Sequence, residues 1–285
     1  MLQVPFVSAP EMRFTEELTE LVGYCTIFIR PDAAPYNRLV IKDLATIEQA
    51  CDQFATLKRA MLAASLNVGC GIRVKDDLAV LNDDAAQLPS EPDQPFVCRQ
   101  ERSLARLIIT AAGPRYQLPR VLPKVIQGIK VAMTSSFAVE ATRDERVALA
   151  CDLYTNSFFE KSVAASFITL IGTLEVLKDQ ESVTPEAIRL ISGWLGKIDQ
   201  LERSEAASFR GQLEHMKQLS ISRGIGRVVS RHLGQDRGRE IQKLYSIRSN
   251  LVHRGEHPAD LQGSLEITQL IVRELLIKIL RAGSR

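Results

Sequence analysis

The stretch LYSIRSNLVHRGEHP, residues 244–258, predicts the closing turns of an amphipathic helix. Its large apolar residues recur at steps of three and four, namely Leu244, Ile247 and Leu251. That spacing places them on one face of a helix, which we expect to anchor in a core. Gly255 and Pro258 follow, and both are typical of a chain that has just left a helix.

Apolar stripes with the same steps continue on both sides of this stretch, over residues 142–283. Two of them, at 147–158 and 163–177, fit either one long helix or two. Residues 264–280 are apolar nearly all round, which indicates a helix that is deeply buried or shared with a second subunit. We therefore predict a bundle of five to seven helices.

Capping residues mark two helix starts within this region. Thr184 is expected to cap a helix whose first position is Pro185. Asp236 is the candidate cap of the helix that ends before Gly255.

The first half of the chain has a mixed pattern. GYCTIFIR (23–30) is rich in β-branched and aromatic residues and predicts a strand, whereas residues 43–67 have helical periodicity. Shorter strands are expected in three places: 69–76, 95–100 and 105–112. Gly69 and Gly71 in GCG favour a turn or a bulge over a nucleotide-binding loop. We expect two domains: an α+β region at residues 1–140, followed by an all-α bundle at 141–285.

Composition indicates a soluble protein with a sizeable core, because 45% of the 285 residues are hydrophobic and 25% are charged. The net charge of +2 implies no particular partner. The five cysteines are scattered without C-x-x-C spacing and favour reduced, mostly buried thiols in a cytoplasmic protein. No histidine cluster accompanies them, so we expect no zinc site and no cofactor. No secretory signal or membrane-length apolar run is found.

Three of the four histidines have an arginine five residues earlier: Arg210–His215, Arg227–His232 and Arg248–His253. Positions five apart on a helix differ by about 140° around the axis, so spacing alone does not make a catalytic pair. The first pair has the character of a solvated helix surface. In the second, Arg227 aligns with Arg223 and Arg231 at steps of four, which fits either a solvated face or a strip that contacts nucleic-acid phosphates.

The third pair has a different context. His253 falls in the last turn of its helix, where backbone carbonyls carry partial negative charge and favour a protonated imidazole. Asn250 lies three residues earlier on nearly the same face and is a candidate to orient His253. A structural role as a C-terminal cap is the competing interpretation, since histidine and arginine often bind the last carbonyls.

This part of the chain resembles the HEPN superfamily, and within it the Apea-like HEPN branch. The resemblance covers residues 143–283 and is carried by seven residues of the quoted stretch: Tyr245, Arg248, Ser249, Leu251, Val252, His253 and Gly255. Glu175 in TLEVL also resembles an acidic position of the family's early helices. Ser249 stands where Asn, Asp or His is common in the family.

The resemblance implies an all-α HEPN-like bundle that acts as a homodimeric, metal-independent endoribonuclease in a toxin or anti-phage effector. His253 would be the general acid or base and Arg248 would stabilise charge on phosphorus, with Asn250 and Ser249 orienting them. Glu175 and Tyr245 would support the site. Four arginines are expected to bind RNA: Arg223, Arg227, Arg231 and Arg254.

Two other functions fit the same residues. One is a non-catalytic HEPN-like module that binds RNA or protein as a scaffold, which the serine at position 249 favours. The other is a bundle that contacts only proteins. In the ribonuclease, residues 1–140 are expected to serve as a sensor or regulatory region that answers a partner or trigger, whereas the first half has no assigned role in the other two functions.

Overall fold

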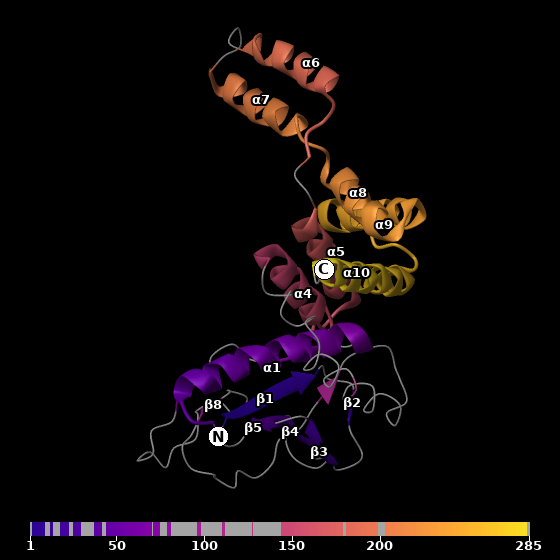
Figure 1. Cartoon of the computed structure of the whole chain (residues 1–285). Coiled ribbons are helices and arrows are strands. Elements are labelled where there is room, and N and C mark those ends of the chain that lie inside the picture. Colours follow the sequence, from indigo (N-terminus) through magenta and orange to yellow (C-terminus); the bar gives the residue numbers. More distant parts are fainter. Residues whose placement is uncertain are drawn as a thin grey trace.

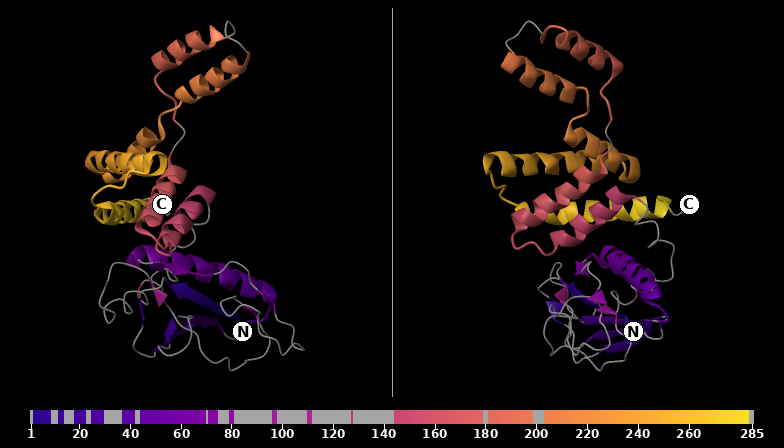
Figure 2. Two further views of the ribbon diagram at one scale, coloured as in Figure 1. Left: turned by 180° about the vertical axis from the view of Figure 1, so that it is seen from behind. Right: turned by 90° about the vertical axis from the view of Figure 1, so that its left-hand side faces the viewer.

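The computed structural model describes residues 44–69, 71–74, 144–178, 181–198 and 203–283, together with the backbone of short strands before residue 112. Figure 1 shows strands and one long helix at the N-terminal end, a helical bundle next to them, and a pair of helices that projects from the bundle. The two views in Figure 2 show the same projection.

The described strands of the first half form a mostly antiparallel sheet with the order β3-β4-β5-β1-β8-β7, while β6 also pairs with β1. Strand bounds are β1 Leu2–Ser8, β3 Leu18–Val22, β4 Cys25–Ile29, β5 Asn37–Ile41, β6 Ile72–Arg73, β7 Ala79–Val80 and β8 Phe96–Val97. A separate pair joins β2 Met12–Arg13 to β9 Thr110–Ala111. Strand β4 lies within the strand expected at 23–30, and the two-residue strands β6, β8 and β9 lie within those expected at 69–76, 95–100 and 105–112. Most other residues of the last three predictions lie outside the described residues.

Helix α1 (Ile47–Val68) lies between this sheet and the bundle (Figure 1). The Thr46 side chain caps its start by accepting a hydrogen bond from the Gln49 amide. Gly69 ends it in the left-handed conformation, at φ 75°, as expected of a glycine in a turn, while Cys70 lies outside the described residues. Arg273 of the bundle donates to the carbonyls of Leu66 and Asn67, which ties the last turn of α1 to the bundle.

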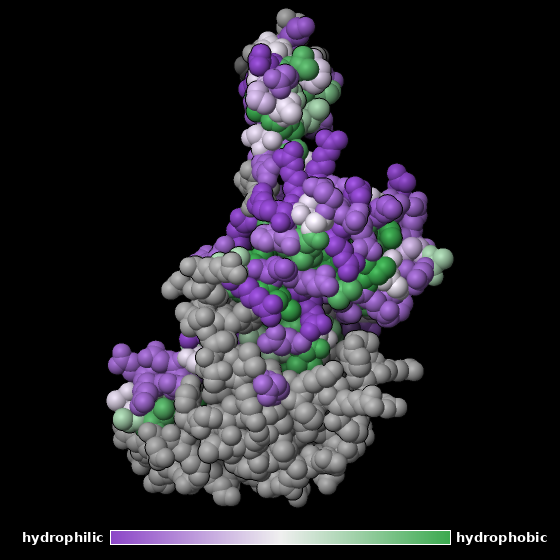
Figure 3. All heavy atoms as spheres, turned by 45° about the vertical axis from the view of Figure 1, so that its right-hand side comes forward, coloured by the Kyte–Doolittle hydropathy of each residue, from purple (hydrophilic) through white to green (hydrophobic). Residues whose placement is uncertain are grey.

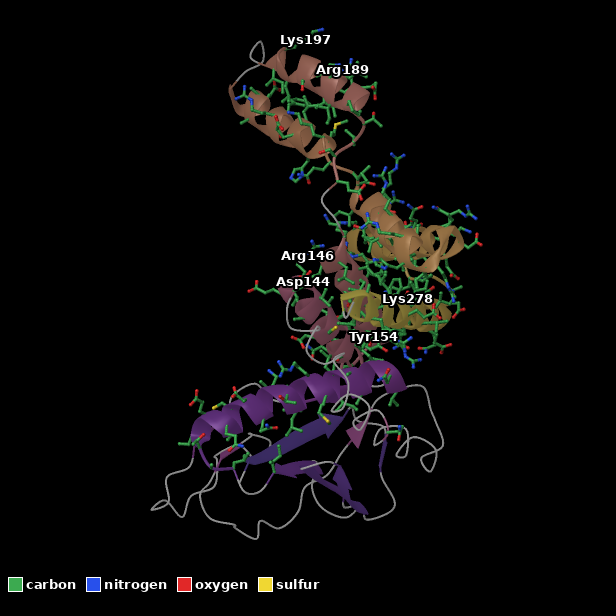
Figure 4. All side chains as sticks on the ribbon, in the orientation of Figure 1. Asp144, Arg146, Tyr154, Arg189, Lys197 and Lys278 are labelled. Atoms are coloured by element: carbon green, nitrogen blue, oxygen red, sulfur yellow. The ribbon has the colours of Figure 1, made fainter. Side chains whose placement is uncertain are left out.

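The second half is helical, as predicted. Its helices are α4 Glu145–Ser157, α5 Val163–Leu177, α6 Pro185–Leu195, α7 Arg203–Met216, α8 Ile221–Leu233, α9 Gln235–Arg254 and α10 Leu261–Gly283. The stripes at 147–158 and 163–177 belong to two helices, because the chain turns after Ser157 and Ser162 caps α5. Arg146 of α4 donates to the carbonyls at the end of α5, where Figure 4 labels it beside Asp144.

One hydrophobic cluster joins α4, α5, α8, α9 and α10. Tyr154 and Phe167 are fully buried in it. Helix α10 supplies five of its most buried side chains, namely Ile271, Val272, Leu275, Leu276 and Leu280, while Ile267 and Leu270 remain exposed. The expectation of a deeply buried last helix is confirmed for one face.

Helices α8 and α9 cross at close range because two glycines face each other's helix. A Cβ on Gly226 would lie 2.4 Å from the Gln242 side-chain nitrogen, and one on Gly238 would lie 1.8 Å from Ser230 Oγ. A Cβ on Gly238 would also lie 2.7 Å from the Gly226 carbonyl oxygen, so Gly238 is restricted to glycine as the helices are packed, whereas a side chain at Gly226 would require Gln242 to move.

Helices α6 and α7 form the projecting hairpin. Thr184 caps α6 and Pro185 occupies its first turn, as predicted. The two connections of the hairpin pair at Ser182 and Gln218, and the Leu219 amide donates to the Glu181 carbonyl at 2.9 Å. Several large apolar side chains on the hairpin are exposed: Leu190, Trp194, Phe209 and Met216.

The prediction that Asp236 caps α9 is wrong. The cap position is Gly234, at φ 97°, without a side-chain hydrogen bond to the first turn. Asp236 lies inside that turn and forms an ion pair with Arg239. Its carboxylate still favours the positive end of the helix dipole, so the acidic residue was placed in the correct turn but at the wrong position.

Candidate functional site

Arg248 lies on α9 and points to the seam with α5. Its Nη2 is 3.3 Å from Oε1 of Glu175, and the two side chains are only 20% and 27% exposed. The guanidinium also stands 5.9 Å from the centre of the Tyr245 ring, in cation–π range. The sequence reasoning named these three residues together, and the structure brings them into contact.

The contact leaves part of the hydrogen-bonding capacity unused. Arg248 Nε and Glu175 Oε1 are buried, and neither has a hydrogen-bond partner among the described residues. A guanidinium has five N–H donors in a fixed fork, so Arg248 retains donors for an anion beyond Glu175.

Tyr245 belongs to the same environment. Burial raises the pKa of its phenol, the Glu175 carboxylate raises it further, and Arg248 opposes them. Tyr245 is therefore a neutral hydroxyl at physiological pH, packed against the bundle core through its ring.

His253 occupies the last turn of α9, as predicted, and is exposed. Gly255 ends the helix in the left-handed conformation, and its amide donates to the Asn250 carbonyl. The Asn250 side chain is exposed as well, and the described structure contains no hydrogen bond between it and His253. Ser249 is half-buried and has no side-chain hydrogen bond there.

Arg248 and His253 leave the helix in different directions. They are separated by about 140° around the axis and about 7.5 Å along it. Within one chain, Arg248 therefore faces α5 whereas His253 faces solvent.

A second polar site lies between α8 and α9, around a groove of about 490 Å³. Arg227 and Arg231, one turn apart on α8, both form ion pairs with Glu181, the second at 3.1 Å. Arg239 of α9 also lines the groove. Figure 3 shows hydrophilic residues over much of this face of the bundle.

Glu181 and Arg239 were missed by the sequence reasoning. Glu181 precedes the two arginines by 46 and 50 residues, and the hairpin separates them, so no local spacing signals the contact. Arg223 lies exposed one turn before Arg227, and Arg254 is exposed and 3.8 Å from Glu256.

The pair Arg210–His215 lies on α7, where both side chains are exposed, as predicted for a helix surface. Of the cysteines, Cys151 is buried and Cys51 is exposed, so the expectation of mostly buried thiols holds for only one of the two described. Burial and the neighbouring Asp152 raise the pKa of the Cys151 thiol to about 12. Cys25, Cys70 and Cys98 lie outside the described side chains.

Within the described ranges, no group of three His, Cys, Asp or Glu side chains is placed to hold a metal ion. None of the helices described is both long and apolar enough to cross a membrane. In comparisons with known proteins, no family model, no curated protein and no solved structure matches the chain.

Proposed function

We propose that the chain is a metal-independent endoribonuclease of HEPN type. The observation that supports this most is the anchoring of Arg248 by Glu175 and Tyr245, with His253 exposed at the end of the same helix. An arginine fixed by a second helix and a solvent-facing histidine are the two groups that RNA cleavage needs, because RNA carries its own nucleophile.

The reaction follows from these groups. His253 removes the proton from a ribose 2′-hydroxyl, and the 2′-oxygen attacks the adjacent phosphorus. The 5′-oxygen of the next nucleotide leaves and takes up a proton. Arg248 donates hydrogen bonds to the phosphoryl oxygens as negative charge accumulates on them. The products are a 2′,3′-cyclic phosphate and a 5′-hydroxyl end.

A homodimer completes this proposal. Because Arg248 and His253 diverge within one chain, a two-fold axis near the end of α9 would present one chain's histidine with its partner's arginine. The second histidine would then supply the proton for the leaving oxygen. In this proposal residues 1–140 are an α+β sensor or regulatory region, and the protein is a cytoplasmic toxin or anti-phage effector.

The test is cleavage of mixed single-stranded RNA in EDTA by the wild type, Arg248→Ala and His253→Ala. The chain offers a matched control in Arg210→Ala and His215→Ala, which have the same spacing on the exposed surface of α7. We expect cleavage by the wild type and by both control variants, and loss in the other two. If the wild type leaves the RNA intact, or all variants cut equally, the proposal is wrong.

A second candidate is a non-catalytic RNA- or protein-binding scaffold of the same type. The pairing of Arg248 with Glu175 favours it, since a charge already partnered is a normal structural element of a helix seam. Salt-sensitive RNA binding without new 5′-hydroxyl ends would support this candidate over the first.

A further inference from the structure

We propose that single-stranded RNA lies along the exposed side of α9, with upstream phosphates in the groove between α8 and α9 and Glu181 as the carboxylate they displace. That the ligand is RNA rests on the proposed function. The new elements are the path along which the RNA binds and the carboxylate, Glu181, that its phosphates displace.

The groove has the chemistry of a phosphate site. Among the described residues, the lining consists of three guanidinium groups, one carboxylate, one hydroxyl and two amides: Arg227, Arg231, Arg239, Glu181, Ser230, Gln235 and Gln242. Asp236, outside the lining, pairs with Arg239. Arginine is suited to phosphate because its fork binds two oxygens at once. The three arginines come from two helices, so they surround the groove instead of forming a line on one helix.

Glu181 holds two of these arginines in a way that a phosphate can replace. Arg227 and Arg231 are each 55% exposed and Glu181 is 30% exposed. Ion pairs of that exposure contribute little to stability, since water solvates the separated charges nearly as well. A phosphodiester offers the same guanidinium donors two negatively charged oxygens, so it can take the place of the carboxylate at low energetic cost.

The start of α9 contributes shape to the groove. Gly234 provides no side chain to cap the first turn, and Gln235 of that turn lines the groove. The same glycine ends α8, so the opposite ends of two helix dipoles meet here, and the positive charge of the groove comes from its arginines.

Beyond the groove, which ends at Gln242, polar residues continue toward His253 along one side of α9. Arg239 and His253 are fourteen residues apart, so their directions around the helix axis differ by only about 40°. The two residues therefore lie on the same side of α9. Between them on this side lie Gln242, Ser246 and Asn250, all half-buried or exposed and polar. Arg248, in contrast, points to the seam with α5. The exposed side of α9 is thus an uninterrupted polar path from the groove to the candidate catalytic histidine.

The length of this path sets the size of the ligand. Fourteen residues of helix rise about 21 Å. At about 3.4 Å per stacked nucleotide, that distance corresponds to about six nucleotides. The affinity of the wild type is therefore expected to increase with RNA length up to about six nucleotides and to level off beyond.

The experiment measures binding of 2′-O-methyl RNA, which has no free 2′-hydroxyl and is not cleaved. The full-length protein is titrated with labelled oligonucleotides of two to twelve residues by fluorescence anisotropy, over a range of salt concentrations. Three variants are compared with the wild type: Arg239→Gln, Glu181→Gln and the triple change of Arg227, Arg231 and Arg239 to Gln. Arg189→Gln is the matched control, because Arg189 is exposed on the hairpin away from the groove (Figure 4).

Each lost phosphate contact lowers the salt slope by about 0.7 for single strands, or about fivefold in affinity near ~0.1 M salt. We expect that loss for Arg239→Gln and about three times the slope change for the triple variant. Glu181→Gln is expected to bind more tightly and with a steeper slope, since it removes the competing carboxylate from Arg227 and Arg231. Arg189→Gln should match the wild type.

Arg239→Gln keeps the experiment interpretable if the triple variant misfolds, since among the described residues Arg239 pairs with the exposed Asp236 of its own helix. Unchanged affinity and slope in both Arg239→Gln and Glu181→Gln would overturn the proposal. Because the ligand is not cleavable, this result is independent of whether the protein cuts RNA. Groove binding without cleavage of ordinary RNA would instead refute only the ribonuclease.

Discussion

Replacing Glu175 by alanine tests whether the contact between α5 and α9 is a coupled ion pair that holds Arg248 in place. The change removes the carboxylate that lies 3.3 Å from Arg248 Nη2. Arg248 then keeps its charge in a position that is four-fifths shielded from water, with its buried Nε already lacking a partner. An isolated charge in such a place is more costly than the lost attraction alone.

The expected magnitude follows from the geometry. At 3.3 Å and an effective dielectric constant of about 20, the attraction is about 5 kcal/mol before desolvation is subtracted. Desolvation of both groups offsets more than half of it, which leaves a cost of about 2 kcal/mol for Glu175→Ala. For a chain of this size, that lowers the melting temperature by about 4–8 °C.

The assay is a double-mutant cycle of Glu175→Ala, Arg248→Met and the double variant, followed by thermal unfolding. We expect the double variant to lose about 1–2 kcal/mol less than the sum of the single changes, because it removes the stranded charge. The pair Glu186–Arg189, at 3.5 Å but over 70% exposed, serves as the control and should show a coupling below about 0.5 kcal/mol. Additive effects at 175 and 248 would refute the anchoring of Arg248.

Three further outcomes are expected. Gly238→Ala should destabilise the protein by about 2–3 kcal/mol in denaturant titration, because its Cβ meets the neighbouring helix, whereas Gly211→Ala, which has open space, should stabilise it by up to about 1 kcal/mol. His253→Ala should lower the rate of RNA cleavage in EDTA by about 10²–10⁴-fold with RNA affinity retained. Iodoacetamide at pH 8 followed by peptide mapping should label Cys51, while Cys151, with a pKa of about 12, should react only after unfolding.

Helix periodicity and capping residues were sufficient to predict most elements of the bundle. The apolar steps of α9 place Leu244 and Leu251 in the core, and Gly255 ends the helix as expected. These features are readable because they depend on neighbours within one or two turns.

The sequence predicted only those features of the candidate site that depend on residues within one or two helical turns. The position of His253 in the last turn of α9 is local and was identified, whereas the carboxylate partner of Arg227 and Arg231 was not. That contact depends on how the chain returns to the bundle after the hairpin. The Gly226–Gly238 crossing was missed for the same reason, because a glycine's neighbour across a helix interface is set by packing and not by spacing.

The base of the α6–α7 hairpin has a consequence for how this protein can change. The chain leaves and re-enters the bundle at two segments that pair at Ser182 and Gln218. The hairpin between them is therefore a closed insertion in the bundle. Lengthening, shortening or exchanging the helices beyond that point alters no distance within the core. The hairpin can therefore diverge in evolution or be replaced by design while the bundle stays constant. A new binding surface can be placed on the hairpin without a redesign of the site on α9.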